Sequence, residues 1–166
     1  MLALETLSKL VNRVLVFFAA VALAAMMFFA VADMVLRRFG ITVAGSYEII
    51  GWISAGALAL ALGSVQQHRG HVAIDLLLTR LGQRPRAVID LLMSLLALLL
   101  FAAVTWYVFA YGHLLQQTGS LSETLKVIVY PWVYVVAAGT AGLALALLLD
   151  FVRAARNCRL LLHSGH

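Results

Sequence analysis

Charged residues are scarce in this sequence. Asp, Glu, Lys and Arg make up only 11% of the 166 residues, whereas a soluble domain carries about 25%. Hydrophobic residues account for 64% of the chain. This composition excludes an ordinary soluble domain and indicates an integral membrane protein. The net charge of +5 therefore does not point to nucleic acid, because basic loops that orient a protein in the bilayer explain it.

Cysteine and proline are also rare. The single Cys158 excludes an internal disulfide and a cysteine-based metal cluster. Only two prolines occur, Pro85 and Pro131, and each stands at the start of a long apolar stretch. Proline is best tolerated in the first turn of a helix, where its missing N–H is not needed. Each proline is therefore expected near the beginning of a helix.

Four long stretches lack Asp, Glu, Lys and Arg: Val14–Ala32, Ile49–Val65, Leu91–Leu115 and Val127–Leu149. Each approaches or exceeds the roughly 20 apolar residues that a helix needs to cross a bilayer. We therefore predict an all-α integral membrane protein with four spanning helices, in which residues 1–166 form a single domain. The expected spans are residues 13–36, 47–66, 86–113 and 131–150.

Basic residues are unevenly distributed between the two sides of these spans. Three of them, Arg37, Arg38 and Lys126, fall on one side. The other nine fall in the terminal segments and in the middle connection, as Lys9, Arg13, Arg69, Arg80, Arg84, Arg86, Arg153, Arg156 and Arg159. Because cytoplasmic loops carry the excess of Lys and Arg, this distribution predicts that both termini lie in the cytoplasm.

The most polar stretch is QQHRGHVAID, residues 66–75, directly after the second expected span. His68 and His71 could share a helix face, but only Asp75 is near enough in sequence to complete a metal-binding set. A bis-histidine haem would need histidines on facing helices at membrane depth, and His113 falls toward the opposite side of the bilayer. We therefore expect no metal and no cofactor in this chain.

The residues after His71 show helical spacing. Apolar residues recur at positions i, i+3, i+4 and i+7, as Ile74, Leu77, Leu78 and Leu81. This pattern predicts a short amphipathic helix over residues 71–82, lying in the cytoplasmic interface against anionic lipid headgroups. His71 and Asp75 are four residues apart and could pair on its polar side. The alternative interpretation is an ordinary cytoplasmic loop with some helix, which differs little from the predicted amphipathic helix.

Acidic residues stand near the ends of the expected spans, and the span centres carry no Asp, Glu, Lys or Arg. Carriers usually hold polar or ionisable residues at that depth. Three acids have a base at helical spacing, in the pairs Asp33–Arg37, Arg86–Asp90 and Asp150–Arg153. We interpret these pairs as anchors of the helix ends. The alternative, a proton site at Asp33 or Asp90, would need an acid deeper in the membrane.

Small residues recur every four positions in two of the expected spans. The second span carries Gly51, Ala55, Ala59 and Gly63, and the fourth carries Ala138, Gly142 and Ala146. Such stripes let helix backbones approach closely in a membrane. They predict helix contacts, either within the chain or with a partner helix, and the spacing does not separate these two possibilities.

Several short motifs, spread over roughly Leu10 to Arg156, are similar to those of one transporter family. An Arg–aromatic step ends the first span at Arg38, and Glu48 precedes the second span in SYEIIGW. An Arg-Gly-His-x-x-x-Asp pattern follows the second span, as Arg69, Gly70, His71 and Asp75. QRPR, with Pro85, opens the third span, and YPWVY, with Pro131, opens the fourth. Together they resemble the small membrane subunit, the DctQ-like family, of tripartite ATP-independent periplasmic (TRAP) transporters.

The resemblance implies a non-catalytic permease subunit in the bacterial inner membrane. Its partners would be a large DctM-like membrane subunit and a periplasmic binding protein, in addition to membrane lipids. The large subunit would hold the substrate and sodium sites, and the binding protein would deliver an organic acid. The small subunit would support the large one and help form the platform on which the binding protein docks.

Two other functions remain open from the residues alone. The chain could anchor a haem or quinone enzyme in the membrane through His71 or His113. It could also be a self-sufficient small exporter that depends on Asp33. The empty centres of the four expected spans favour a support subunit over both alternatives.

Overall fold

The computed structural model describes residues 2–67 and 83–163. They form four helices, α1 (Leu2–Arg38), α2 (Ser46–Gln67), α4 (Gln83–Thr118) and α5 (Tyr130–His163). In these ranges the only β-type pairing is an isolated antiparallel bridge between Leu121 and Ile128. The prediction of an all-α protein with four long apolar helices is therefore confirmed. The interfacial helix predicted over residues 71–82 lies outside the described residues.

Three of the helices are longer than a bilayer crossing requires. α1 has 37 residues, which at 1.5 Å per residue corresponds to about 55 Å, whereas the hydrocarbon core is about 30 Å thick. α4 and α5 have 36 and 34 residues, while α2 has 22. Long helices accommodate this excess by tilting or by projecting into the headgroup region. The helices therefore extend beyond the expected spans, most clearly at the start of α1 and at the end of α5.

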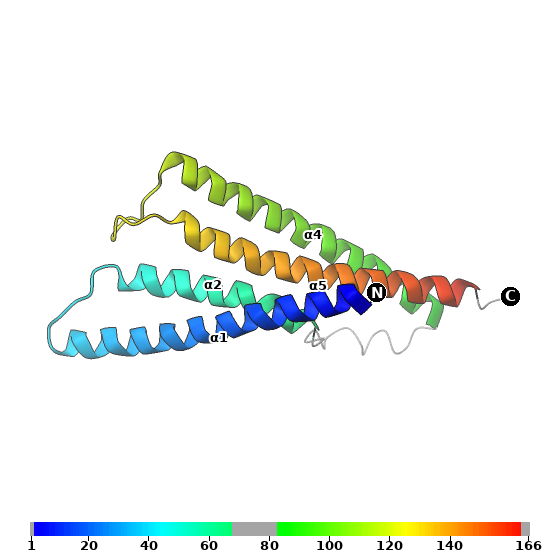
Figure 1. Ribbon diagram of the computed structural model, residues 1–166, viewed down its shortest axis with the longest axis horizontal. Helices are drawn as coiled ribbons and strands as arrows, with labels where there is room; N and C mark the ends of the chain where they lie inside the picture. The colour runs from blue at the N-terminus through cyan, green and yellow to red at the C-terminus, as the bar shows by residue number, and fades with distance from the viewer. Residues whose placement is uncertain (1, 68–82, 164–166) are drawn as a thin grey trace.

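The four helices run alternately in opposite directions (Figure 1). The N-terminus, the C-terminus, the last residues of α2 and the first residues of α4 lie toward one end of the molecule. The α1–α2 and α4–α5 connections lie together at the other end. We call these the terminal end and the loop end. This topology places both termini on the same side of any membrane that the helices cross.

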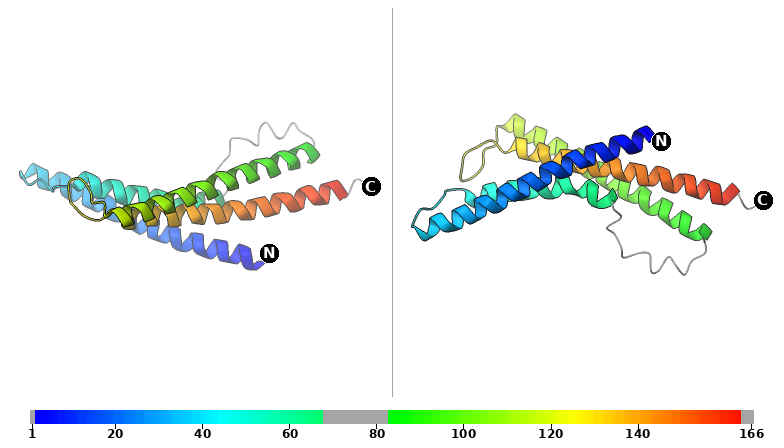
Figure 2. Two further views of the ribbon diagram at one scale, coloured as in Figure 1. Left: turned by 90° about the horizontal axis from the view of Figure 1, so that it is seen from above. Right: turned by 60° about the horizontal axis from the view of Figure 1, so that its bottom comes forward.

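The helices form a fan around α5 rather than a closed bundle, as the turned views show (Figure 2). α5 packs along both α4 and α2, and α2 packs along α1, while α1 touches α5 less extensively. In the most apolar 18-residue window of α5, 44% of the residues are buried, against 6% in α1 and in α4. α5 is therefore the central helix, and α1 and α4 keep large apolar faces uncovered.

The helix boundaries at the loop end follow from local chemistry. Gly40 has a φ of 78°, and its N–H donates to the carbonyl of Arg37 at 3.1 Å. The N–H of Ile41 donates to the carbonyl of Leu36, also at 3.1 Å. This pattern is a Schellman motif, in which a left-handed glycine ends a helix. α5 begins at Tyr130, so that Pro131 lies in its first turn as expected.

Candidate assembly site

Helices α2 and α5 cross with their backbones in direct contact. A Cβ atom added to Gly139 would meet the backbone carbonyl of Ala59 and would lie 2.7 Å from the backbone nitrogen of Leu60. Small residues at such a crossing let two helices gain dispersion contacts along their length. Gly139 therefore sets the separation of α2 and α5, although it does not belong to the predicted stripe on α5.

A buried polar cluster ties α1 to the same pair of helices. Ser8 and Asn12 are 0% and 1% exposed. The Asn12 amide Nδ2 donates to the Ser8 carbonyl oxygen at 3.0 Å and to the Gly142 carbonyl oxygen at 3.4 Å. Gln67 Nε2 donates to Ser8 Oγ at 2.9 Å. The cluster joins α1, α2 and α5 toward the terminal end.

Two glycines make room for side chains of α1. The Oδ1 atom of Asn12 occupies the space that a Cβ at Gly63 would need, and the Leu15 side chain occupies the space that a Cβ at Gly142 would need. Ser8 and Asn12 escape sequence reasoning because they precede the first uncharged window. Their i, i+4 spacing on one face of an apolar helix is the signal that could have found them.

The two predicted stripes of small residues divide between buried and exposed positions. Four members are buried: Ala59, Gly63, Gly142 and Ala146. The other three, Gly51, Ala55 and Ala138, are exposed. A Cβ at Gly51 would find no neighbouring atom within 4 Å. The buried members make contacts inside the chain, whereas the exposed members leave a smooth surface for lipid or for another helix.

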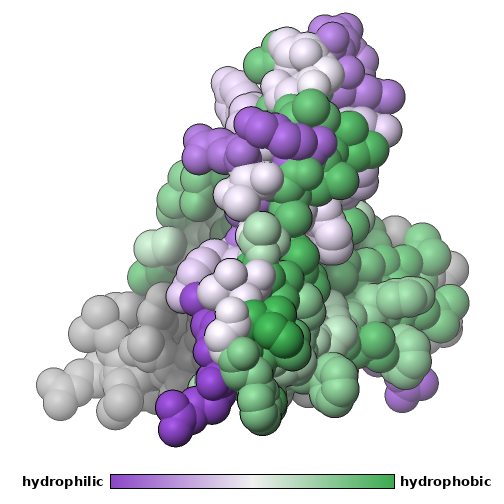
Figure 3. Space-filling view, turned by 90° about the vertical axis from the view of Figure 1, so that its left-hand side faces the viewer, coloured by the Kyte–Doolittle hydropathy of each residue, from purple (hydrophilic) through white to green (hydrophobic). Residues whose placement is uncertain are grey.

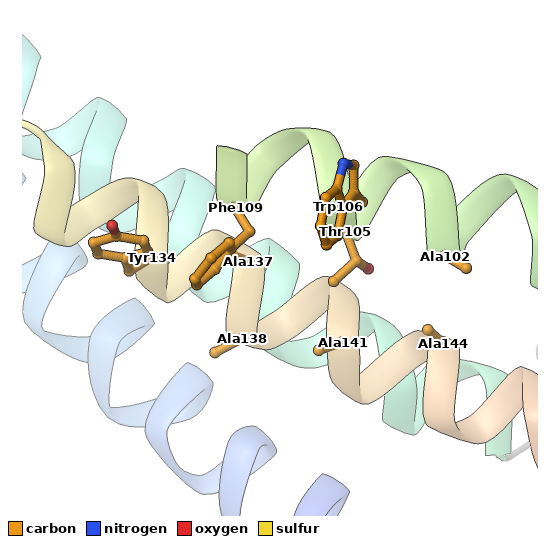
Figure 4. Close-up of a pocket in the computed structure, with 9 residues that line it drawn as sticks. All are labelled: Ala102, Thr105, Trp106, Phe109, Tyr134, Ala137, Ala138, Ala141 and Ala144. Atoms are coloured by element: carbon orange, nitrogen blue, oxygen red, sulfur yellow. The ribbon is translucent and has the colours of Figure 1, made fainter. Parts of the chain in front are cut away.

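An apolar groove runs between α4 and α5 (Figure 4). It encloses about 750 Å³, and its lining residues are Ala102, Thr105, Trp106, Phe109, Tyr134, Ala137, Ala138, Ala141 and Ala144. Alanines of α5 line one side, while Trp106 and Phe109 of α4 line the other. The Thr105 hydroxyl donates to its own helix, to the Phe101 carbonyl at 2.8 Å. The groove therefore offers packing surface rather than polar recognition.

At the loop end, a charged cluster joins the end of α1 to the start of α2. Arg37 Nε donates to Asp33 Oδ2 at 2.8 Å, which confirms the predicted pair. Arg37 Nη2 donates to Ser46 Oγ at 2.9 Å, and the guanidinium lies 5.1 Å from the centroid of the Tyr47 ring. The neighbouring motif residue Arg38 is exposed. Asp33 therefore has a cationic partner, as the anchoring interpretation requires.

Glu48 fastens the α4–α5 connection to the start of α2. Its Oε1 accepts a hydrogen bond from the Thr124 N–H at 2.9 Å, and its Oε2 accepts one from the Leu125 N–H at 3.3 Å. The Leu125 side chain fills the space that a Cβ at Gly45 would need, and Gly45 has a φ of 75°. These contacts bring together two connections that are about 80 residues apart in the sequence.

At the terminal end, Arg153 joins α5 to the N-terminal turns of α1. Arg153 Nη2 lies 3.1 Å from Glu5 Oε1, and Arg153 Nη1 lies 3.7 Å from Asp150 Oδ1. The predicted Asp150–Arg153 pair is therefore confirmed. Gln66 Nε2 also donates to Asp150 Oδ2 at 2.9 Å, which adds α2 to the network.

The remaining predicted residues fall into two groups. Pro85, in the first turn of α4, and Pro131 are exposed, as is His113 near the loop end of α4. The residues outside the described ranges are Arg69, Gly70, His71 and Asp75. In residues 2–67 and 83–163, no three His, Cys, Asp or Glu side chains are grouped as a metal ion would need.

The family of the chain follows from comparison with known proteins. Residues 26–157 match the tripartite ATP-independent periplasmic transporters, DctQ component, and this range includes parts of all four helices. Neither the curated proteins nor the solved structures gave a match. The family match confirms the resemblance drawn from the motifs, and the four long apolar helices agree with a multi-pass membrane protein. The chain therefore belongs to the DctQ family, the small permease subunits of TRAP transporters, which are inner-membrane proteins.

Proposed function

We propose that this chain is a non-catalytic support subunit of a sodium-coupled transporter. A large DctM-like subunit would carry an organic acid across the membrane, and a periplasmic binding protein would deliver that acid. The chain would widen the membrane footprint of the large subunit and contribute to the docking surface for the binding protein. The DctQ family supports the role in a TRAP transporter, and the distribution of charge supports the division of labour.

The position of the acidic side chains is the observation that carries the support role. In the described part of the chain, each acid lies in a connection or within about four helical turns of a helix end: Glu5, Asp33, Glu48, Asp90, Glu123 and Asp150. Asp150 accepts a hydrogen bond from Gln66 of α2, and Glu48 accepts two from the α4–α5 connection. Asp33 pairs with Arg37 of its own helix, and Arg37 in turn bonds Ser46 of α2. Ion and proton pathways usually require such groups at membrane depth. These acids are therefore better placed to stabilise the fold than to carry ions or protons across the membrane.

The uncovered helix faces support a large membrane partner. α1 and α4 lie at the two sides of the fan and bury only 6% of their most apolar windows. α1 presents large exposed apolar side chains, such as Phe17, Met27 and Phe28. Lipid can cover these faces, and so can the helices of another subunit, because both are apolar. The fan thus provides more apolar surface than its own packing uses.

Co-purification and uptake test the proposal together. The tagged chain, expressed with its neighbouring transporter subunits, should co-purify with a large membrane protein. Deletion of this chain should abolish sodium-dependent uptake of the organic acid, and the chain supplied in trans should restore it. Full uptake without the chain would contradict the proposal, as would transport by the purified chain alone in liposomes.

A further inference from the structure

The α4–α5 connection is an ordered hairpin. Ser122 N–H donates to the Val127 carbonyl at 2.8 Å, next to the bridge between Leu121 and Ile128. Lys126, between them, has a φ of 54°, in the left-handed region that non-glycine residues rarely adopt. A residue holds such a backbone conformation only where its surroundings enforce it. The contacts around Lys126 must therefore supply that constraint.

Glu48 supplies the constraint from outside the hairpin. Both oxygens of its carboxylate accept backbone N–H groups, those of Thr124 and Leu125, directly before Lys126. Hydrogen bonds to an ionised acceptor are stronger than those between neutral groups. An acid in the first turn of a helix normally serves the N–H groups of its own helix. Here the acid reaches across to a connection that is 76 residues away in the sequence.

We call the Glu48 carboxylate, with the two hairpin N–H groups that it binds, the clamp. The turn that carries Glu48 is itself held in place. Leu125 packs into the space above Gly45, one residue before the start of α2. The Arg37 guanidinium bonds both Asp33 and Ser46, and so holds the same turn from the side of α1. Ser46 is 1% exposed. Glu48 therefore projects from a well-packed turn, and its two hydrogen bonds restrain the hairpin relative to that turn.

The hairpin presents a mixed surface at the loop end. Glu123, Thr124 and Lys126 are exposed, beside the exposed apolar side chains of Val127 and Ile128. Seen from this end, hydrophilic patches alternate with hydrophobic ones (Figure 3). Transient protein–protein interfaces also combine polar and apolar side chains. The surface is therefore suited to reversible binding of a soluble protein.

We propose that Glu48 is a positioning residue, whose carboxylate holds the α4–α5 hairpin in the conformation that a soluble binding protein recognises at the loop end. The inference rests on the proposed function, because it takes the binding protein as the partner. It assigns a specific task to a residue that belongs to the family motif. Since a loop ordered before binding loses less entropy on binding, the clamp should increase affinity without changing the transport step.

Amide hydrogen exchange of the purified chain in detergent tests the clamp without requiring transport. In Glu48→Ala, peptides that cover residues 119–129 should exchange about tenfold faster than in the wild-type chain. Peptides from the middle of α5 should be unchanged. Glu48→Gln keeps one carbonyl acceptor and should give an intermediate rate. Glu123→Ala is the matched control, because it removes a neighbouring acid and leaves the Glu48 carboxylate in place; its hairpin should exchange as in the wild-type chain.

Uptake into proteoliposomes tests the docking. With the complete transporter reconstituted and the binding protein titrated, Glu48→Ala should raise the half-saturating concentration of binding protein about fivefold or more. The maximal rate should stay within about twofold of wild type, as expected when only binding is weakened. A merely structural role would instead lower the yield of complex and the maximal rate. Glu48→Gln should recover part of the affinity.

Two results would overturn the inference separately from the proposed function. Unchanged exchange in Glu48→Ala would show that the carboxylate does not hold the hairpin. Faster exchange with an unchanged half-saturating concentration would show that hairpin order does not serve docking. By contrast, wild-type uptake that does not depend on this chain would contradict the proposed function and the docking step, while the exchange rates would still decide the clamp.

Discussion

At the residue scale, three glycines on two helices perform different tasks. Gly139 removes a side chain so that the backbones of α2 and α5 can touch. Gly63 and Gly142 instead make space for side chains of α1, Gly63 for the amide of Asn12 and Gly142 chiefly for Leu15. Because Asn12 is buried, the hydrogen bonds of its Nδ2 to Ser8 and Gly142 replace those that this nitrogen would make with water, whereas its Oδ1 has no partner among the described residues. One polar side chain thus specifies how three apolar helices meet.

Gly63→Ala should destabilise the isolated chain, because the added methyl group would collide with Asn12 Oδ1. Overpacking of a tight core costs about 1–3 kcal/mol, which thermal unfolding in detergent should detect as a lower Tm. Gly51→Ala is the matched control on the same helix. It should be neutral or stabilise the chain by up to about 1 kcal/mol, because its Cβ would enter open space. Equal Tm losses in the two variants would contradict this account.

At the element scale, α1 packs along α2 and carries an additional charged contact near each of its ends. Its N-terminal turns contact α5 through Glu5 and Arg153, whose side chains are 30% and 43% exposed. Its C-terminal turn contacts α2 through Arg37, which bonds Ser46. Arg37 also pairs with Asp33, and the Asp33 side chain is only 9% exposed. Solvent screens the first pair and reaches the second much less. The two ends should therefore respond differently to substitution and to salt.

Glu5→Gln should lower stability by less than about 1 kcal/mol, and high salt should remove most of the difference from wild type. Asp33→Asn should cost more and should depend less on salt, because it removes the carboxylate from a largely buried contact. Unfolding in detergent at low and high ionic strength measures both effects. A larger effect of Glu5→Gln than of Asp33→Asn would reverse the assignment of the two anchors.

At the scale of the whole molecule, the alternating helices place both termini at one end. Among the described residues, three basic residues lie at the loop end, Arg37, Arg38 and Lys126. Seven lie in the parts of the helices toward the terminal end: Lys9, Arg13, Arg84, Arg86, Arg153, Arg156 and Arg159. The positive-inside rule then favours a cytoplasmic terminal end and a periplasmic loop end. This orientation, which we propose, puts the hairpin on the side where a binding protein would dock.

Cysteine labelling in spheroplasts should test the orientation in a Cys158→Ser background. Thr124→Cys, in the exposed hairpin, should react with a membrane-impermeant maleimide added from outside. Asn157→Cys, exposed near the end of α5, should react only after the membrane is permeabilised. The opposite labelling pattern would place the termini in the periplasm and would remove the hairpin from the docking side.

Across these scales, the sequence predicted those features that depend on a single helix, such as its position and the pairs of charges along it. Uncharged windows located four helices, and i, i+4 spacing located the Asp33–Arg37 pair, because both depend on local chain geometry. The stripes indicated close packing, but their spacing could not separate Ala55, which is exposed, from Ala59, which is buried. That distinction depends on which face of α2 meets α5. Gly139 stayed hidden for the same reason, whereas Ser8 and Asn12 stayed hidden because they precede the first uncharged window.

The sequence by itself determined that this chain is an α-helical membrane protein of the DctQ family, since apolar length and short motifs are properties of the linear chain. Only the tertiary structure decided that α5 lies at the centre of a fan. It alone also decided that Glu48 holds a hairpin 76 residues away. The physical reason is that such contacts depend on the crossing of helices and on side-chain space, which no local pattern encodes.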